Sequence, residues 1–169
     1  VLSLFIEETE IPKADLQKII KEAITFPIRV SHLTKNEKNE SCILRSDDPS
    51  FHPNNITWAL NSLHILELFN GPTFTFKDIG MQFLGRVMAY LLDHNEERKE
   101  KITIIVATSG DTGSAAIHAV ENHPLIDLYV LYPGENRISE LQERQMATNT
   151  AENIFCIRFD GSSDDADVV

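Results

Sequence analysis

The 169-residue chain has little cysteine, little positive charge and no long apolar run. Its two cysteines, Cys42 and Cys156, lack metal-ligand spacing, and a reduced pair in a cytoplasmic protein is favoured over a disulfide. The 15 basic and 26 acidic residues give a formal net charge of −11, which argues against binding to nucleic acid or to an anionic membrane surface. No apolar run approaches the ~20 residues of a membrane span, and no signal peptide is expected.

What is present is the composition of a globular protein, with 42% hydrophobic and 24% charged residues. Residues 1–62 predict a helical N-terminal segment followed by a polar insertion. Pro12 opens a helix with regular apolar spacing and Pro27 ends it, so residues 1–34 are expected to be helical. Residues 35–62 are rich in charged residues, asparagine and proline, which is typical of a connecting loop or surface insertion.

Residues 63–169 predict an α/β unit, because strand-like and helix-like patterns alternate about every 25 residues. Strands are expected at 63–69, 102–107, 126–132 and 153–159, and helices at 77–94, 112–122 and 139–148. This order is typical of an open, mainly parallel sheet, and the almost wholly apolar run 102–107 is typical of a strand buried inside one. Ser139 and Gln142 form a capping box at the start of the last helix.

Two strand-to-helix junctions lie at the carboxyl ends of predicted strands, where such sheets bind ligands. One of them, Ala107–Ser114, reads Ala-Thr-Ser-Gly-Asp-Thr-Gly-Ser. Its glycines allow a tight turn, and its hydroxyls and helix N-terminal amides can hold a carboxylate or a phosphate. It matches neither a P-loop nor a Gly-x-Gly-x-x-Gly fingerprint. A plain capping turn, with Ser109 or Asp111 as the N-cap, explains the same residues equally well.

The other junction, Gly71–Asp78, carries a single lysine where a helix begins. Lys77 is flanked by Phe74 and Phe76, and an apolar wall can disfavour the charged form of its amine. A neutral amine is a nucleophile that can hold a carbonyl cofactor as a Schiff base. The simpler alternative is a lysine that covers surface or pairs with Asp78, and this junction taken alone favours that alternative.

Taken in order, the two junctions resemble those of the fold-type II pyridoxal phosphate enzymes, and within them the threonine synthase family. Leu66–Asp78 is similar to the cofactor-lysine segment of that family, and Ala107–Ala116 is similar to its substrate loop. Leu131–Gln142 and residues 160–165 also follow the family pattern. The resemblance covers most of the chain outside residues 35–62. It implies an open parallel sheet of the tryptophan synthase β kind and an incomplete enzyme.

The resemblance implies a lyase that converts O-phosphohomoserine, a small phosphorylated amino acid, and water to L-threonine and phosphate. It implies pyridoxal 5′-phosphate as the cofactor, held by Lys77, which also moves protons as a general acid and base. It places Asp111 near the 3′ oxygen of the cofactor, with Ser109 and Thr112 on the substrate carboxylate. No metal is implied. The residues implied in substrate binding are Thr108, Ser109, Gly110, Asp111 and Thr112.

The chain also departs from the family pattern. Its seven glycines include no second cluster for the cofactor phosphate, and Asn70 stands where the family often has histidine. Two alternatives to a threonine synthase therefore remain. A threonine synthase-like phospho-lyase would share both junctions but release 2-oxobutanoate, ammonia and phosphate. A truncated, non-catalytic interaction module is favoured by the missing phosphate loop.

Overall fold

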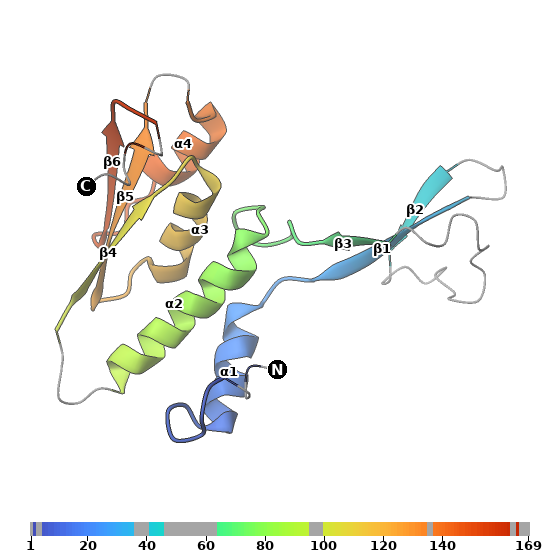
Figure 1. The fold of residues 1–169 in the computed structure, drawn as a ribbon, viewed down its shortest axis with the longest axis horizontal. Helices are drawn as coiled ribbons and strands as arrows, with labels where there is room; N and C mark the ends of the chain where they lie inside the picture. The colour runs from blue at the N-terminus through green and yellow to red at the C-terminus, as the bar shows by residue number, and fades with distance from the viewer. Residues whose placement is uncertain are drawn as a thin grey trace.

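The computed structural model describes residues 2, 5–35, 41–45, 64–94, 100–134, 137–162 and 165. They form an α/β unit and a three-stranded antiparallel arm that extends from it (Figure 1). In chain order the elements are α1 (Lys13–Ala23), β1 (Arg29–Lys35), β2 (Ser41–Arg45), β3 (His64–Glu67), α2 (Lys77–Asp93), β4 (Ile102–Ala107), α3 (Asp111–Val120), β5 (Ile126–Pro133), α4 (Glu140–Ala147) and β6 (Ile154–Phe159).

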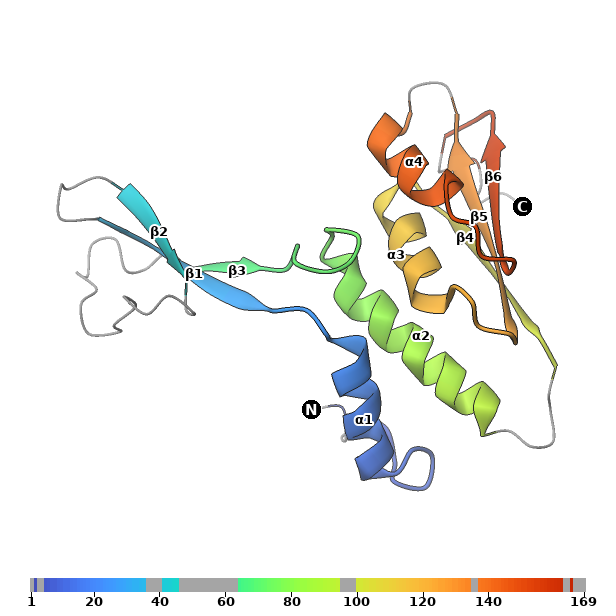
Figure 2. The ribbon, with the colours of Figure 1, turned by 180° about the vertical axis from the view of Figure 1, so that it is seen from behind.

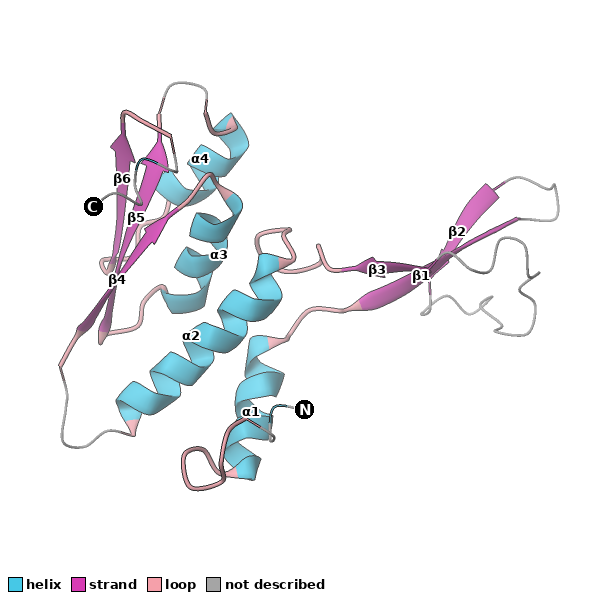
Figure 3. Cartoon of the chain, in the orientation of Figure 1, coloured by secondary structure: helices cyan, strands magenta, loops and turns pink. Residues whose placement is uncertain are grey.

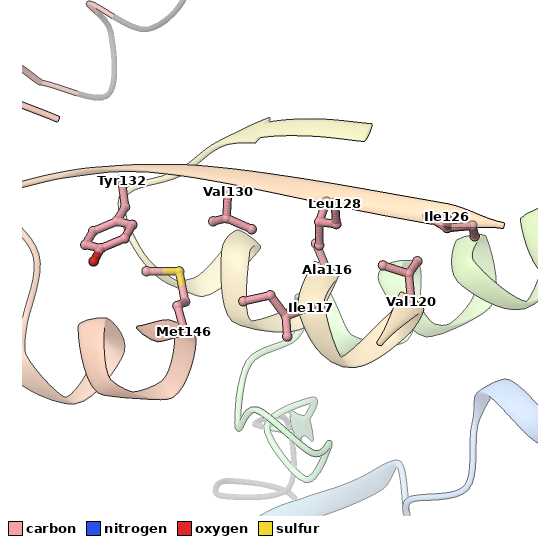
Figure 4. Close-up of a cluster of buried hydrophobic side chains, with 8 residues drawn as sticks. All are labelled: Ala116, Ile117, Val120, Ile126, Leu128, Val130, Tyr132 and Met146. Carbon is pink, nitrogen blue, oxygen red and sulfur yellow. The ribbon is translucent and has the colours of Figure 1, made fainter. Parts of the chain in front are cut away.

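A parallel sheet in the order β4-β5-β6 forms the base of the α/β unit. The central strand β5 turns alternate side chains toward the helices, and Ile126, Leu128 and Val130 have 0% exposed surface. They pack against side chains of α3 and against Met146 of α4 (Figure 4). Alternation of this kind is what a strand with one face in the core requires. The predicted parallel α/β architecture is confirmed.

The helices are stacked on one face of this sheet (Figure 3). Helix α3 covers the strands, α4 packs against α3 and adds Met146 to the core over β5, α2 packs against α3, and α1 packs against α2. Helix α2 consequently has two apolar faces. Met81, Met88 and Leu92 contribute to the core over the sheet. Three other side chains of α2, namely Phe83, Val87 and Tyr90, pack against the apolar cluster of α1.

The other face of the sheet remains open in the described part of the chain. Ile105 of β4 is 68% exposed, and its neighbours across the sheet are Tyr129 and Phe155, whose rings stack at 4.6 Å. Strand β4 is also an edge strand, with alternate residues exposed. The prediction that residues 102–107 form a fully buried strand was therefore wrong, because only one face of β4 meets a helix layer.

The antiparallel arm corrects two further predictions. Residues 29–34 belong to strand β1 and are not helical; the predicted helix is confirmed as α1, but it ends before Pro27 and the chain is extended beyond it. Strand β3 pairs with β1 in the arm and not with the parallel sheet. The sequence pattern predicted a helix for most of the residues that form β1, so it could not show that β3 pairs with them. The buried hydroxyl of Ser31 donates to the carboxylate of Glu67 and joins the two strands.

The arm also contains β2, which lies inside the predicted insertion. The rest of residues 36–63 falls outside the described residues. Cys156 is a free cysteine and burial raises its pKa, whereas the side chain of Cys42 is not among those described. None of the helices in the described ranges has the length and apolar character needed to cross a membrane.

Candidate active site

The packing of α2 on α3 brings the two predicted junctions to one end of the α/β unit. Nδ1 of His118 lies 3.3 Å from Oε1 of Gln82, and a Cβ on Gly85 would lie 2.5 Å from the carbonyl oxygen of Ala119. Residue numbers rise together across these contacts, so the two helices run in the same direction. Figure 2 shows both helix N-termini toward the same side of the unit.

This alignment places Lys77 near the level of the α3 N-terminus. Lys77 lies five residues before Gln82, which is about 8 Å along a helix axis, and Asp111 lies seven residues before His118, which is about 11 Å. No hydrogen bond or ion pair among the described residues joins Lys77 directly to the loop before α3. The structure therefore brings the two junctions to one end without linking them.

The first of them, here called the lysine junction (residues 71–78), is held by Asp78. The carboxylate of Asp78 is fully buried and accepts hydrogen bonds from the amide nitrogen of Thr73 at 2.9 Å and from its hydroxyl at 2.6 Å. A Cβ on Gly71 would lie 2.4 Å from Oδ2 of the same carboxylate, so only glycine fits there. Phe74, at φ 61°, adopts the left-handed conformation that non-glycine residues seldom take. Asp78 thus holds a tight and strained turn in place.

Because Asp78 is turned inward, it does not pair with Lys77 in the part of the chain that the structure describes. The Lys77 side chain is half-buried, and its Nζ lies 5.7 Å from the centroid of the Phe76 ring. Phe74 and Phe76 are 74% and 62% exposed, so the predicted apolar wall around the amine is not formed by these rings. What the junction offers is an accessible amine at a rigid position.

The second junction, here called the glycine loop (residues 108–113), is organised by the last hydroxyl before α3. Oγ1 of Thr108 accepts the N–H groups of Gly110 at 2.9 Å and Gly113 at 3.0 Å, and Thr108 is only 4% exposed. The N-cap position is occupied by Gly110, with φ 142° and no side-chain cap. The alternative with Ser109 or Asp111 as the N-cap was therefore wrong; the hydroxyl that accepts N–H groups of the loop and first turn belongs to Thr108, two positions before the N-cap.

The glycine loop leaves backbone donors available at the start of α3. None of the hydrogen bonds found among the described residues uses the N–H groups of Asp111 or Thr112. The helix dipole adds a partial positive charge at this point, and the side chain of Ser109 is exposed beside it. Such an arrangement can bind a carboxylate or phosphate oxygen. The role predicted for Ser109 and Thr112 on a substrate carboxylate stays a prediction.

Sequence reasoning missed one residue that contacts this loop. Nε2 of Gln142, at the start of α4, donates to Oδ1 of Asp111 at 2.6 Å. The capping box that predicted the α4 start is present, with Ser139 as the N-cap. Nothing in the sequence indicated where the amide nitrogen of Gln142 points, since 31 residues separate it from Asp111.

Comparison with known proteins shows to which proteins the chain is related. No family model matches it. Over 169 residues it is 37% identical to threonine synthase of Saccharomyces cerevisiae, an alignment that covers 97% of this chain and 29% of the yeast protein. The chain is homologous to part of the threonine synthases. It is also 37% identical, over 168 residues, to threonine synthase-like 2 of Xenopus laevis, covering 99% of this chain and 30% of that protein.

Solved threonine synthase structures share the fold. The crystal structure of the Escherichia coli threonine synthase matches with a TM-score of 0.73 at 32% identity, covering 99% of this chain and 31% of that one. The pyridoxal phosphate-bound threonine synthase of Brucella melitensis matches with a TM-score of 0.66 at 33% identity, covering 99% and 31%. The predicted fold-type II architecture is confirmed, and the chain spans about 30% of the length of the threonine synthases it matches.

Proposed function

We propose that the protein containing this chain is a pyridoxal phosphate-dependent threonine synthase, which converts O-phosphohomoserine and water to L-threonine and phosphate. One observation carries the proposal. In a chain homologous to threonine synthases, α2 and α3 run parallel and present the amine of Lys77 and the N–H groups of Asp111 and Thr112 at the same end of the fold. An amine and backbone donors at the same end of the fold suit an amino-acid substrate bound to a carbonyl cofactor.

The residues present fit one end of the cofactor. Lys77 offers a half-buried amine with no ion pair among the described residues, and an amine can condense with the aldehyde of the cofactor. Asp111 would lie near the 3′ oxygen. The sequence contains no further glycine cluster for the cofactor phosphate. When bound, pyridoxal phosphate supplies an electron sink for carbanions formed on the substrate.

The chain's own residues then have distinct roles. Lys77 moves protons at its Nζ as a general acid and base, held at a fixed position because Asp78 locks the turn before it. The N–H groups of Asp111 and Thr112, which no other described residue accepts, bind the substrate carboxylate together with the hydroxyl of Ser109. Thr108 maintains the loop that exposes these groups.

Covalent labelling tests the cofactor assignment. The native-length protein is incubated with pyridoxal phosphate, reduced with borohydride and mapped by mass spectrometry. Label is expected on Lys77 and is expected to disappear in Lys77→Met. Lys101→Met is the matched control, because Lys101, just before β4, pairs with Asp127 of β5 at 2.9 Å and has no part in the site. Label on other lysines with none on Lys77 would contradict the proposal and favour a non-catalytic interaction module.

A second candidate function has its own support, namely the equal identity to threonine synthase-like 2. A phospho-lyase of this kind would convert phosphohomoserine and water to 2-oxobutanoate, ammonia and phosphate. Product analysis with phosphohomoserine separates the two reactions, because both release phosphate but only the synthase yields threonine. Ammonia and 2-oxobutanoate without threonine would replace the synthase by the phospho-lyase.

A further inference from the structure

We propose that Gln142 is a positioning residue of the glycine loop: its amide holds the Asp111 carboxylate aside and so keeps the N–H groups at the start of α3 open for an anionic substrate. The inference rests on the proposed function, since it assigns substrate binding to that loop. Gln142 itself lies in the first turn of α4 and is separated from Asp111 by 31 residues of chain.

The capping box fixes the orientation of the Gln142 amide. Its oxygen accepts two hydrogen bonds from Ser139, from the hydroxyl at 2.7 Å and from the amide nitrogen at 3.3 Å. The opposite edge of the amide, Nε2, is therefore the donor that faces away from Ser139. It reaches Oδ1 of Asp111 at 2.6 Å, a charge-assisted hydrogen bond to a half-buried carboxylate. The Gln142 side chain thus takes part in the capping box of α4 and also contacts Asp111, the first residue of α3.

The contact is reinforced by the backbone of the loop. A Cβ on Gly110 would lie 2.6 Å from Cδ of Gln142, so the glycine loop packs directly on the amide. Gly110 also needs its φ of 142°, which favours glycine. The Gln142 amide therefore meets the loop at two adjacent residues, once through the carboxylate and once through the main chain.

Restraint of Asp111 matters because of where its carboxylate stands. Asp111 is the first residue of α3, and short acidic side chains at a helix start readily accept hydrogen bonds from the N–H groups of the first turn. An unrestrained Asp111 would occupy the anion site itself and repel a negatively charged substrate. Held by Gln142, it leaves the N–H groups of Asp111 and Thr112 available.

The sharpest variant is Gln142→Glu. Glutamate preserves the capping box, which accepts either residue at this position, but it faces Asp111 with a second carboxylate. We expect the KM for phosphohomoserine to rise about tenfold or more, with a smaller change in kcat, because ground-state binding of the anion is lost. The KM is expected to fall again as the pH is lowered and the new carboxyl is protonated. Leu141→Glu is the matched control, since Leu141 is 70% exposed in the same helical turn.

A second measurement does not depend on turnover. In the double variant Gln142→Glu with Asp111→Asn, donor and acceptor are exchanged and the contact can form again. Its urea unfolding midpoint is expected to exceed that of Gln142→Glu and to approach that of the wild type. A double variant no more stable than Gln142→Glu would overturn the contact.

The outcomes for the two proposals are separate. Normal label on Lys77 and normal turnover, together with an unchanged KM in Gln142→Glu, overturn the role of Gln142 and leave the proposed function standing. A wild-type protein that neither labels at Lys77 nor turns over phosphohomoserine overturns the proposed function, and the role of Gln142 with it.

Discussion

The lysine junction and the glycine loop both begin a helix without a side-chain cap at the N-cap residue, yet they are held in different ways. The lysine junction is closed from within, by the carboxylate of Asp78 in α2 itself. The glycine loop is closed from outside, by Thr108 after β4 and by Gln142 on α4. The first depends on one helix and its preceding turn, and the second depends on the arrangement of three elements. The glycine loop is therefore the junction whose geometry depends more on how other elements are packed.

The largest effect on stability is expected from Asp78→Ala. Removal of this buried carboxylate leaves the amide and hydroxyl of Thr73 without their acceptor, which should lower the free energy of unfolding by about 2–4 kcal/mol. Urea denaturation measures the loss. Asp78→Asn is the control, because it keeps the shape and one acceptor oxygen, and it should cost about 1 kcal/mol. Equal, small losses in both variants would mean that the junction is not closed from within.

A smaller loss is expected when the glycine loop is broken. Thr108→Val keeps the shape but removes the oxygen that accepts the N–H groups of Gly110 and Gly113, and should cost about 1–2 kcal/mol. Ser109→Ala, at an exposed neighbour, should change the stability by less than about 0.5 kcal/mol. If the two variants were equally stable in urea, Thr108 could not be the cap.

The smallest effect belongs to neither junction and lies between α1 and α2. The Tyr90 hydroxyl donates to Oδ2 of Asp15 at 2.8 Å, and this hydrogen bond raises the pKa of Tyr90. A raised pKa stabilises the fold fully below about pH 10, the ordinary value for tyrosine, and the contribution is lost as the pH rises through the raised pKa. The wild type should therefore exceed Tyr90→Phe slightly in unfolding midpoint at pH 7. That advantage should vanish in alkali; a constant difference up to pH 11 would contradict the linkage.

The parts of the fold that sequence could predict are those with local signals. The α1 start at Pro12, the long helix after Lys77 and the capping box at Ser139 all depend on residues close in sequence, and the structure has each of them. Strands 126–132 and 153–159 were also predicted, because each is a short, mostly apolar run next to turn residues. The arm was missed because strand β1 follows a helix without a glycine or asparagine between them and pairs with β3 more than 30 residues away.

The candidate site likewise has parts that the sequence could predict and parts that it could not. Lys77 and the Thr108–Thr112 run were predicted from the order of two motifs, which is a sequence property. The inward turn of Asp78, the cap by Thr108 and the reach of Gln142 were not predictable, because each depends on which of several hydrogen-bonding residues points toward the backbone. Such choices follow from three-dimensional packing, such as the close approach of Gln142 to Gly110.

Gly85 allows the close approach of α2 and α3, the two helices that begin at the lysine junction and the glycine loop. It lies eight residues along α2 from Lys77, which is about 12 Å along the helix axis. Because it carries no side chain, the carbonyl oxygen of Ala119 fills the space that a Cβ would take, and the axes of α2 and α3 are held at a short separation. A larger residue here would leave both junctions intact but move them apart as rigid blocks. The separation of the two junctions thus depends on a contact between the middle of α2 and the last turn of α3, at a position that belongs to neither junction.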